Sequence, residues 1–139
     1  MTESVGPVAA LATLKKMKSL NIPSHVAAIG TAVKELWRNH AVKHGLNIST
    51  EGYPCLAHFK FEDQHADELS TAYTQLMLDR GFLAKTMLYP TLAHTSDTVE
   101  LYGKAIDDVF GILAQSLKKN EIKSILKGPL AHKGFARLN

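Results

Sequence analysis

The 139-residue sequence contains one cysteine, few prolines and no long run of apolar residues. Because Cys55 has no second cysteine to pair with, a disulfide within the chain is excluded, which is typical of proteins from reducing compartments. A membrane-spanning helix needs about eighteen or more consecutive apolar residues, and no stretch approaches that length. The N-terminus also lacks the basic start and apolar segment of a secretory signal. These absences predict a cytoplasmic protein that does not enter a membrane.

The composition that remains is close to the globular average. Apolar residues make up 45% of the chain and charged residues 21%, which excludes general disorder. A chain of this length buries the core of one domain, and nothing in its composition requires that domain to be a complete enzyme. We therefore expect a single folded domain.

The net charge of +3 is unevenly distributed along the chain. From Val109 onward six basic residues oppose only Glu121, so this part carries +5 and residues 1–108 carry −2. The basic residues are Lys118, Lys119, Lys123, Lys127, Lys133 and Arg137. Such a segment can indicate nucleic-acid binding, but here it lacks an aromatic stacking platform and an arginine cluster. We expect a solvated tail and no nucleic-acid partner.

Apolar residues recur at helical spacing in two segments of the N-terminal half, residues 5–20 and 23–44. Gly45 follows the second segment as the expected left-handed end of its helix. The stripe of this helix that should be buried consists of Val26, Ile29, Val33, Leu36 and Trp37.

An antiparallel pair of strands is predicted for residues 46–50 and 55–61, because a turn with glycine and proline separates them and the second segment alternates in polarity. This alternation places Cys55 on the apolar face of the strand. Cys55 could instead be a nucleophile paired with His58 or His94. We prefer the interpretation of a buried and inert thiol.

Two more helices are predicted in the C-terminal half. Asp63 is expected to cap the first, which ends at Arg80 and Gly81. Residues 82–94 should form an irregular connection with a short strand. Thr95-Ser96-Asp97 then opens the most regular helix, which continues to Leu117. The tail that follows should contain one helical turn at residues 121–126 and an extended end.

Together these elements predict an α+β fold, a small antiparallel sheet of two to three strands covered by helices. We expect one domain over residues 1–139, with a connecting helix over residues 1–20, an α+β core over residues 21–118 and a basic tail over residues 119–139. Gly103 and Gly111 lie inside the last helix, where their small size predicts close contact with another element.

Two groups of polar residues are candidates for chemistry. His40 and His44 lie four apart on one helix and could bind one zinc ion, but no third ligand is evident. We therefore expect no metal site and prefer the interpretation that both interact with the negative end of the helix. Asp107 and Asp108 are adjacent and point about 100 degrees apart, which excludes a paired acid–base site and indicates a solvated edge.

Three segments resemble the C-terminal part of the class III pyridoxal-phosphate (PLP) aminotransferases, closest to the branch similar to glutamate-1-semialdehyde aminomutase. They are residues 2–13, 81–95 and 126–135, and the resemblance covers essentially the whole chain. The most specific piece is Ala-His-Thr at residues 93–95, directly before the last helix. The next is Gly-Pro-x-Ala-Ala at residues 6–10.

The resemblance implies a small α+β domain that packs against a large PLP-binding domain. In that family the catalytic lysine, the aspartate at the pyridine nitrogen and the phosphate-binding loop belong to the large domain, and this chain begins at about the point where that domain ends. No lysine here matches the cofactor lysine, so we expect no catalytic residue and no PLP binding by this chain alone. Ser4 stands where many relatives have arginine.

In the parent enzyme the resemblance implies that residues 82–94 face the substrate. Lys85, Thr86 and Tyr89 are the residues expected to lie near it, because they are the polar groups of that connection. The glutamate of the aminomutase pattern is not matched in this connection, which favours an aminotransferase over an aminomutase.

Three interpretations of function follow. In the first, the chain is the C-terminal domain of a PLP-dependent aminotransferase, inactive without the large domain that is its expected partner. The alternative is a stand-alone binding or oligomerisation module that reuses the fold and associates with itself. The third is a small zinc enzyme that uses His40 and His44.

Overall fold

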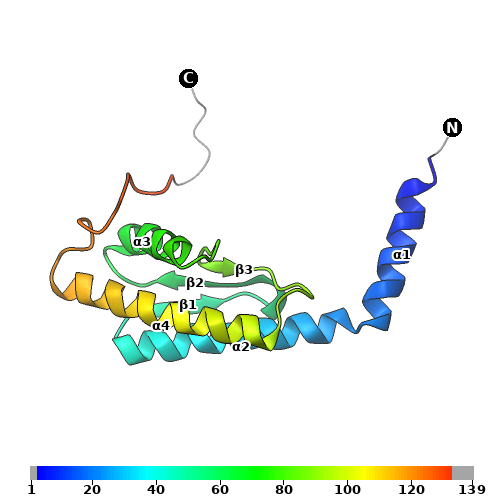
Figure 1. Cartoon of the computed structure of the whole chain (residues 1–139), viewed down its shortest axis with the longest axis horizontal. Helices are drawn as coiled ribbons and strands as arrows, with labels where there is room; N and C mark the ends of the chain where they lie inside the picture. The colour runs from blue at the N-terminus through cyan, green and yellow to red at the C-terminus, as the bar shows by residue number, and fades with distance from the viewer. Residues whose placement is uncertain (1–2, 133–139) are drawn as a thin grey trace, which may run out of the picture.

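The computed structural model describes residues 3–132, which form an α+β fold as predicted (Figure 1). The described part contains four α-helices and three strands. In chain order they are α1 (Val5–Ser19), α2 (Ile22–His44), β1 (Ile48–Glu51), β2 (Ala57–Phe61), α3 (Ala66–Asp79), β3 (Met87–Leu88) and α4 (Ser96–Lys118), with a short 3-10 helix, η1 (Pro54–Leu56), before β2.

The sheet is antiparallel, with β2 between β1 and β3. Thr50 of β1 lies opposite Phe59, and Leu88 of β3 lies opposite Ala57. Ala57 and Phe59 point into the core on the same side as Phe61. The intervening residues of β2 are more exposed, which confirms the predicted alternation over residues 57–61.

Helices α2, α3 and α4 cover the buried side of the sheet and meet around Phe59 (Figure 1). One aromatic ring from each helix contacts the ring of Phe59. The distances between ring centroids are 4.9 Å to Trp37 of α2, 5.3 Å to Tyr73 of α3 and 5.9 Å to Phe110 of α4. This cluster is the centre of the core, and the predicted stripe of α2 contributes to it.

Several close approaches in the core depend on glycine. The carbonyl of Pro54 in η1 lies so near Gly30 of α2 that an added Cβ would be 1.8 Å from the carbonyl oxygen. A Cβ on Gly103 would lie 3.2 Å from the side chain of Leu36, and one on Gly111 would lie 3.3 Å from the ring of His44. The predicted close contact of Gly103 and Gly111 is therefore confirmed, and the element that approaches both is α2.

The prediction that Cys55 begins a strand and is buried is wrong. Cys55 lies in η1 and is exposed. Pro54 fixes the backbone at the start of this turn, and the Leu56 amide donates to the carbonyl of Tyr53 at 2.8 Å, so extended structure begins only at Ala57.

Helix α3 begins two residues later than predicted, at Ala66. The carboxylate of Asp63 accepts a hydrogen bond from the amide of His65 at 2.8 Å, and its carbonyl accepts one from the amide of Ala66. Asp63 therefore forms a turn before the helix and does not cap it. The predicted glycine end is confirmed, since Gly81 has a φ of +83°.

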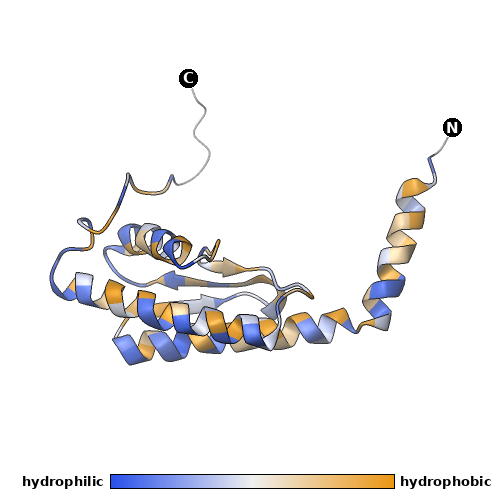
Figure 2. Ribbon diagram, in the orientation of Figure 1, coloured by the Kyte–Doolittle hydropathy of each residue, from blue (hydrophilic) through white to orange (hydrophobic). Residues whose placement is uncertain are grey.

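Helix α1 extends away from the rest of the fold (Figure 1) and contains no buried residue. Its large apolar side chains are exposed, and hydrophobic residues predominate over its N-terminal part (Figure 2). They include Val5, Val8, Leu11 and Leu14. Asn21 joins α1 to α2 in a left-handed conformation, with a φ of +47°.

The first part of the C-terminal tail packs against α3. Residues 121–126 form the expected turn, in which Ile122 is buried. The side chain of Gln75 donates to the carbonyl of Ile125 at 2.9 Å and accepts from the amide of Lys127 at 2.7 Å. The last part of the expected extended end, residues 133–139 with Lys133 and Arg137, lies outside the described residues, as does Thr2. No helix within residues 3–132 is both long and apolar enough to cross a membrane.

Candidate functional site

The connection between α3 and α4 is held by a ring contact with α4 and by a backbone hydrogen bond with β2. Gly81 turns the chain out of α3, and Phe82 then packs its ring against Tyr102 of α4 at 5.7 Å between centroids. The carbonyl of Thr86 accepts from the amide of Phe59 at 2.9 Å, which starts the pairing of β3 with β2. The connection is therefore an ordered part of the sheet edge.

A compact turn at residues 91–94 leads into α4. Nδ1 of His94 accepts from the amide of Thr91 at 3.0 Å. Nε2 of His25, on α2, lies 3.0 Å from the carbonyl oxygen of His94 and 3.3 Å from that of Thr91. Carbonyl oxygens only accept, so this nitrogen carries a hydrogen and donates. Thr95 caps α4 by accepting from the amide of Thr98 at 3.3 Å, which confirms the predicted N-terminus of this helix.

A pocket of about 140 Å³ lies between this connection and the first turns of α4. Its walls are mostly apolar and include Val33 and Val99. Polar groups come from His94, Thr98 and Tyr102. Apolar pockets with a few convergent polar groups are typical ligand or side-chain binding sites, so this is the candidate functional site on the connection.

The hydroxyl of Tyr102 beside this pocket belongs to a buried network that reaches the core. It accepts from the indole nitrogen of Trp37 at 2.9 Å and shares a hydrogen bond with the hydroxyl of Tyr73 at 2.8 Å. Burial raises the pKa of Tyr73 and of Tyr102 above the usual range. Both hydroxyls therefore remain protonated at neutral pH, and the network orients side chains without supplying a base. Trp37, on the predicted buried stripe of α2, required a partner for its indole N–H, which was the available signal in the sequence.

The structure does not bring Lys85, Thr86 and Tyr89 together. Lys85 is exposed at a hollow beside α3, and Tyr89 lies on the other side of the connection, at a hollow shared with His58. The three residues share the connection, but none lines the pocket next to Tyr102. Their proximity to a substrate stays a prediction.

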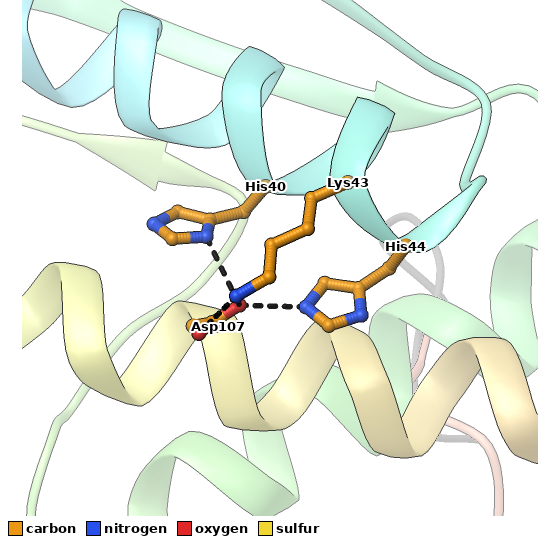
Figure 3. A network of polar contacts seen from close by, with 4 residues as sticks. All are labelled: His40, Lys43, His44 and Asp107. Carbon is orange, nitrogen blue, oxygen red and sulfur yellow. Dashed lines mark hydrogen bonds and ion pairs between the residues drawn. The ribbon is translucent and has the colours of Figure 1, made fainter.

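A second polar cluster joins the C-terminal half of α2 to α4 (Figure 3). Oδ1 of Asp107 accepts from Nδ1 of His40 at 3.2 Å and from Nε2 of His44 at 2.7 Å. Nζ of Lys43 donates to both carboxylate oxygens at 2.7–2.8 Å. Hydrogen bonds from Lys43 and His44 hold the pKa of Asp107 well below its usual range, so it is a carboxylate at neutral pH.

The predicted solvated edge is therefore correct for Asp108 and wrong for Asp107. The two side chains point to different helices, as their adjacency requires. Asp108 is largely exposed and lies 3.8 Å from Nε of Arg80. Asp107 instead turns to α2, because α4 packs along that helix and presents the carboxylate to three cationic or N–H-bearing side chains. No local pattern in the sequence relates Asp107 to His40 and His44.

The lysines of the described residues lie at the surface or are half-buried. A Schiff-base lysine must lie in an enclosed pocket with partners that orient the cofactor. No lysine within residues 3–132 is buried. Lys34, which is half-buried, donates from Nζ to the carbonyl of Gly52 at 2.8 Å, and Lys85 is exposed.

The fold nevertheless has a counterpart in a PLP protein. No family model and no curated protein sequence matches this chain. Among solved structures, it is similar to the FumI protein of Sphingopyxis sp. MTA144 in its PLP internal aldimine form, with a TM-score of 0.74 over 88% of this chain and 20% sequence identity. The chain spans 30% of the length of that protein. The similarity shows that this chain has the fold of a domain found in a PLP-dependent protein.

Proposed function

We propose that this chain is the C-terminal domain of a PLP-dependent class III aminotransferase of the branch similar to glutamate-1-semialdehyde aminomutase. The similarity to FumI, which covers 88% of this chain and 30% of that protein, is the observation that supports it. The parent enzyme would transfer an amino group on an amino acid or amino-aldehyde or keto substrate. A cytoplasmic location belongs to this proposal and is supported by the single cysteine.

The exposed apolar surface supports a role as a domain that packs against a larger one. Leu83 on the connection is 96% exposed, and Tyr89 is 60% exposed. Leu11 and its apolar neighbours on α1 are also exposed. Contact with a large PLP-binding domain would cover such side chains. The connection at residues 82–94 would then form one wall of the active site, with Lys85, Thr86 and Tyr89 near the substrate.

The first test is the reaction of the isolated chain with PLP. Because no lysine among the described residues has a pocket that orients the cofactor, we expect borohydride reduction to leave only scattered, substoichiometric pyridoxyl-lysine, measured by peptide mass spectrometry. A stoichiometric adduct on one lysine would contradict the proposal that the chain is inactive alone.

Sequencing of the coding DNA on either side of the chain provides the complementary observation. We expect it to encode a domain with the cofactor lysine.

A second candidate function is self-association, which the apolar surface of α1 favours. If α1 meets a second copy of the chain, replacement of Leu11 by lysine should shift the sedimentation profile from oligomer to monomer. The thermal midpoint should not change at concentrations where the unmodified chain is also a monomer, because Leu11 contributes nothing to the core. Leu101→Lys is the matched control, since Leu101 is exposed to a similar degree on α4. A monomer at all concentrations for the unmodified chain would exclude this candidate.

A further inference from the structure

We propose that His40, His44 and Asp107 bind one zinc ion that bridges α2 and α4, with the fourth coordination position open to water. This site is separate from the connection at residues 82–94 and does not depend on the function proposed above. It lies about two turns of α2 from Val33, which lines the pocket beside Tyr102.

The geometry places three ligand atoms of suitable chemistry at one point (Figure 3). One ring nitrogen of His40, one of His44 and a carboxylate oxygen of Asp107 all lie within 4.8 Å of one another. A tetrahedral zinc ion with bonds of about 2.0–2.1 Å holds its ligand atoms about 3.3 Å apart. The N–O distance of 3.2 Å at His40 is close to this value, and the distance of 2.7 Å at His44 must lengthen by about 0.6 Å. The two ring nitrogens, within 4.8 Å of each other, must approach by up to about 1.5 Å, which rotation of the side chains supplies.

The backbone preorganises the two histidines. Their spacing of four residues on α2 places both imidazoles on the same side of the helix. Gly111, one turn after Asp107 on α4, leaves the space in which the ring of His44 lies, since an added Cβ would be 3.3 Å from Cε1 of that ring. Both histidine side chains are about one-fifth exposed, so the site is shielded by protein on the inside and accessible from solvent.

The ligand set selects the type of metal. Two imidazole nitrogens and one carboxylate oxygen are the donors of zinc sites that retain a water ligand. Magnesium and calcium prefer sites made of oxygen atoms alone, so they should not bind here. A neutral imidazole has a hydrogen on only one of its two ring nitrogens. The nitrogen that now faces Asp107 can therefore bind zinc when the hydrogen lies on the other nitrogen of the same ring.

Lys43 competes with the metal for Asp107. Its ammonium group is bonded to both carboxylate oxygens, and its side chain is 58% exposed, so it can move into solvent when a divalent cation takes its place. This competition distinguishes a metal site from an ion-pair cluster. Removal of the lysine charge should strengthen zinc binding, whereas in an ion-pair cluster it would only weaken the contact between the helices.

The test is a titration of the chelator-treated full chain with zinc chloride, followed by calorimetry and elemental analysis after dialysis. We expect one zinc ion per chain. His40→Gln, His44→Gln and Asp107→Asn should each weaken binding at least about tenfold, since loss of even an outer-shell partner has an effect of that size. Lys43→Gln should tighten it. His58→Gln is the matched control, because His58 also pairs with a carboxylate, that of Glu51, and has no third ligand within the described residues.

A measurement on the unmodified chain keeps the proposal testable if a ligand variant fails to fold. Zinc should shift the ring nitrogen resonances of His40 and His44 and leave those of His25 and His58 in place. Cobalt(II) at the same site should give the visible absorption of a tetrahedral ion. Absence of zinc binding, equal affinity in the ligand variants and the unmodified chain, or resonance shifts confined to other histidines would overturn the proposal.

Discussion

Replacement of Gly30 by alanine should destabilise the domain by about 3 kcal/mol. The carbonyl of Pro54 would lie 1.8 Å from the new Cβ, so either η1 or α2 must shift. The contact involves backbone on both sides, and no flexible side chain can yield. Urea unfolding followed by circular dichroism measures the effect, and we expect a lower midpoint with an unchanged slope.

Gly6→Ala is the control for helix propensity in this experiment. Gly6 lies in α1, where nothing approaches the position of an added Cβ within 4 Å. Alanine should therefore leave the stability unchanged or raise it by up to about 1 kcal/mol. If Gly30→Ala behaved in the same way, the close approach of η1 to α2 would be contradicted.

The second large effect is expected for Phe59→Ala, which should lower the free energy of unfolding by about 3–5 kcal/mol. Phe59 is 1% exposed, and its ring contacts rings from all three helices that cover the sheet. The T-shaped contact with Tyr73, at 90° between the ring planes, is one of the interactions lost with the ring. Because the deletion leaves a cavity where three helices meet, the near-ultraviolet circular dichroism of Trp37 should change as well.

Tyr53→Ala provides the comparison for loss of an aromatic ring outside the core. Tyr53 is 77% exposed and precedes η1, so its removal should change the stability by no more than about 0.5 kcal/mol. If Phe59→Ala and Tyr53→Ala lowered the free energy of unfolding by similar amounts, the ring of Phe59 would not anchor the helices on the sheet.

Features that depend on neighbours in the sequence could be predicted from it. The spacing of Ile29, Val33 and Trp37 identified the buried side of α2, and all three are buried. The glycine ends at Gly45 and Gly81 and the cap at Thr95 were also confirmed, because each follows from the backbone conformation of one or two residues. The α+β class follows from the order of these elements.

Features that depend on distant residues could not be predicted in the same way. Asp107 lies 63 residues from His44 in the sequence, and only the packing of α4 along α2 brings them together. The exposure of Cys55 depends on η1, whose position is set by the contact of Pro54 with Gly30. The alternating pattern of residues 55–61 contains no information about that contact. The resemblance pointed to the connection at residues 82–94, but not to the division of its polar residues between separate hollows.

Helix α1 is joined to the rest of the domain through Asn21, so its direction depends on the backbone angles of that residue. Its 15 residues extend about 22 Å at the rise of an α-helix. A rotation of about 10° at Asn21 would therefore displace the N-terminal end of α1 by about 4 Å. Small changes in the backbone angles of this one left-handed residue would therefore move the exposed apolar side chains of α1 by several ångströms relative to the connection at residues 82–94.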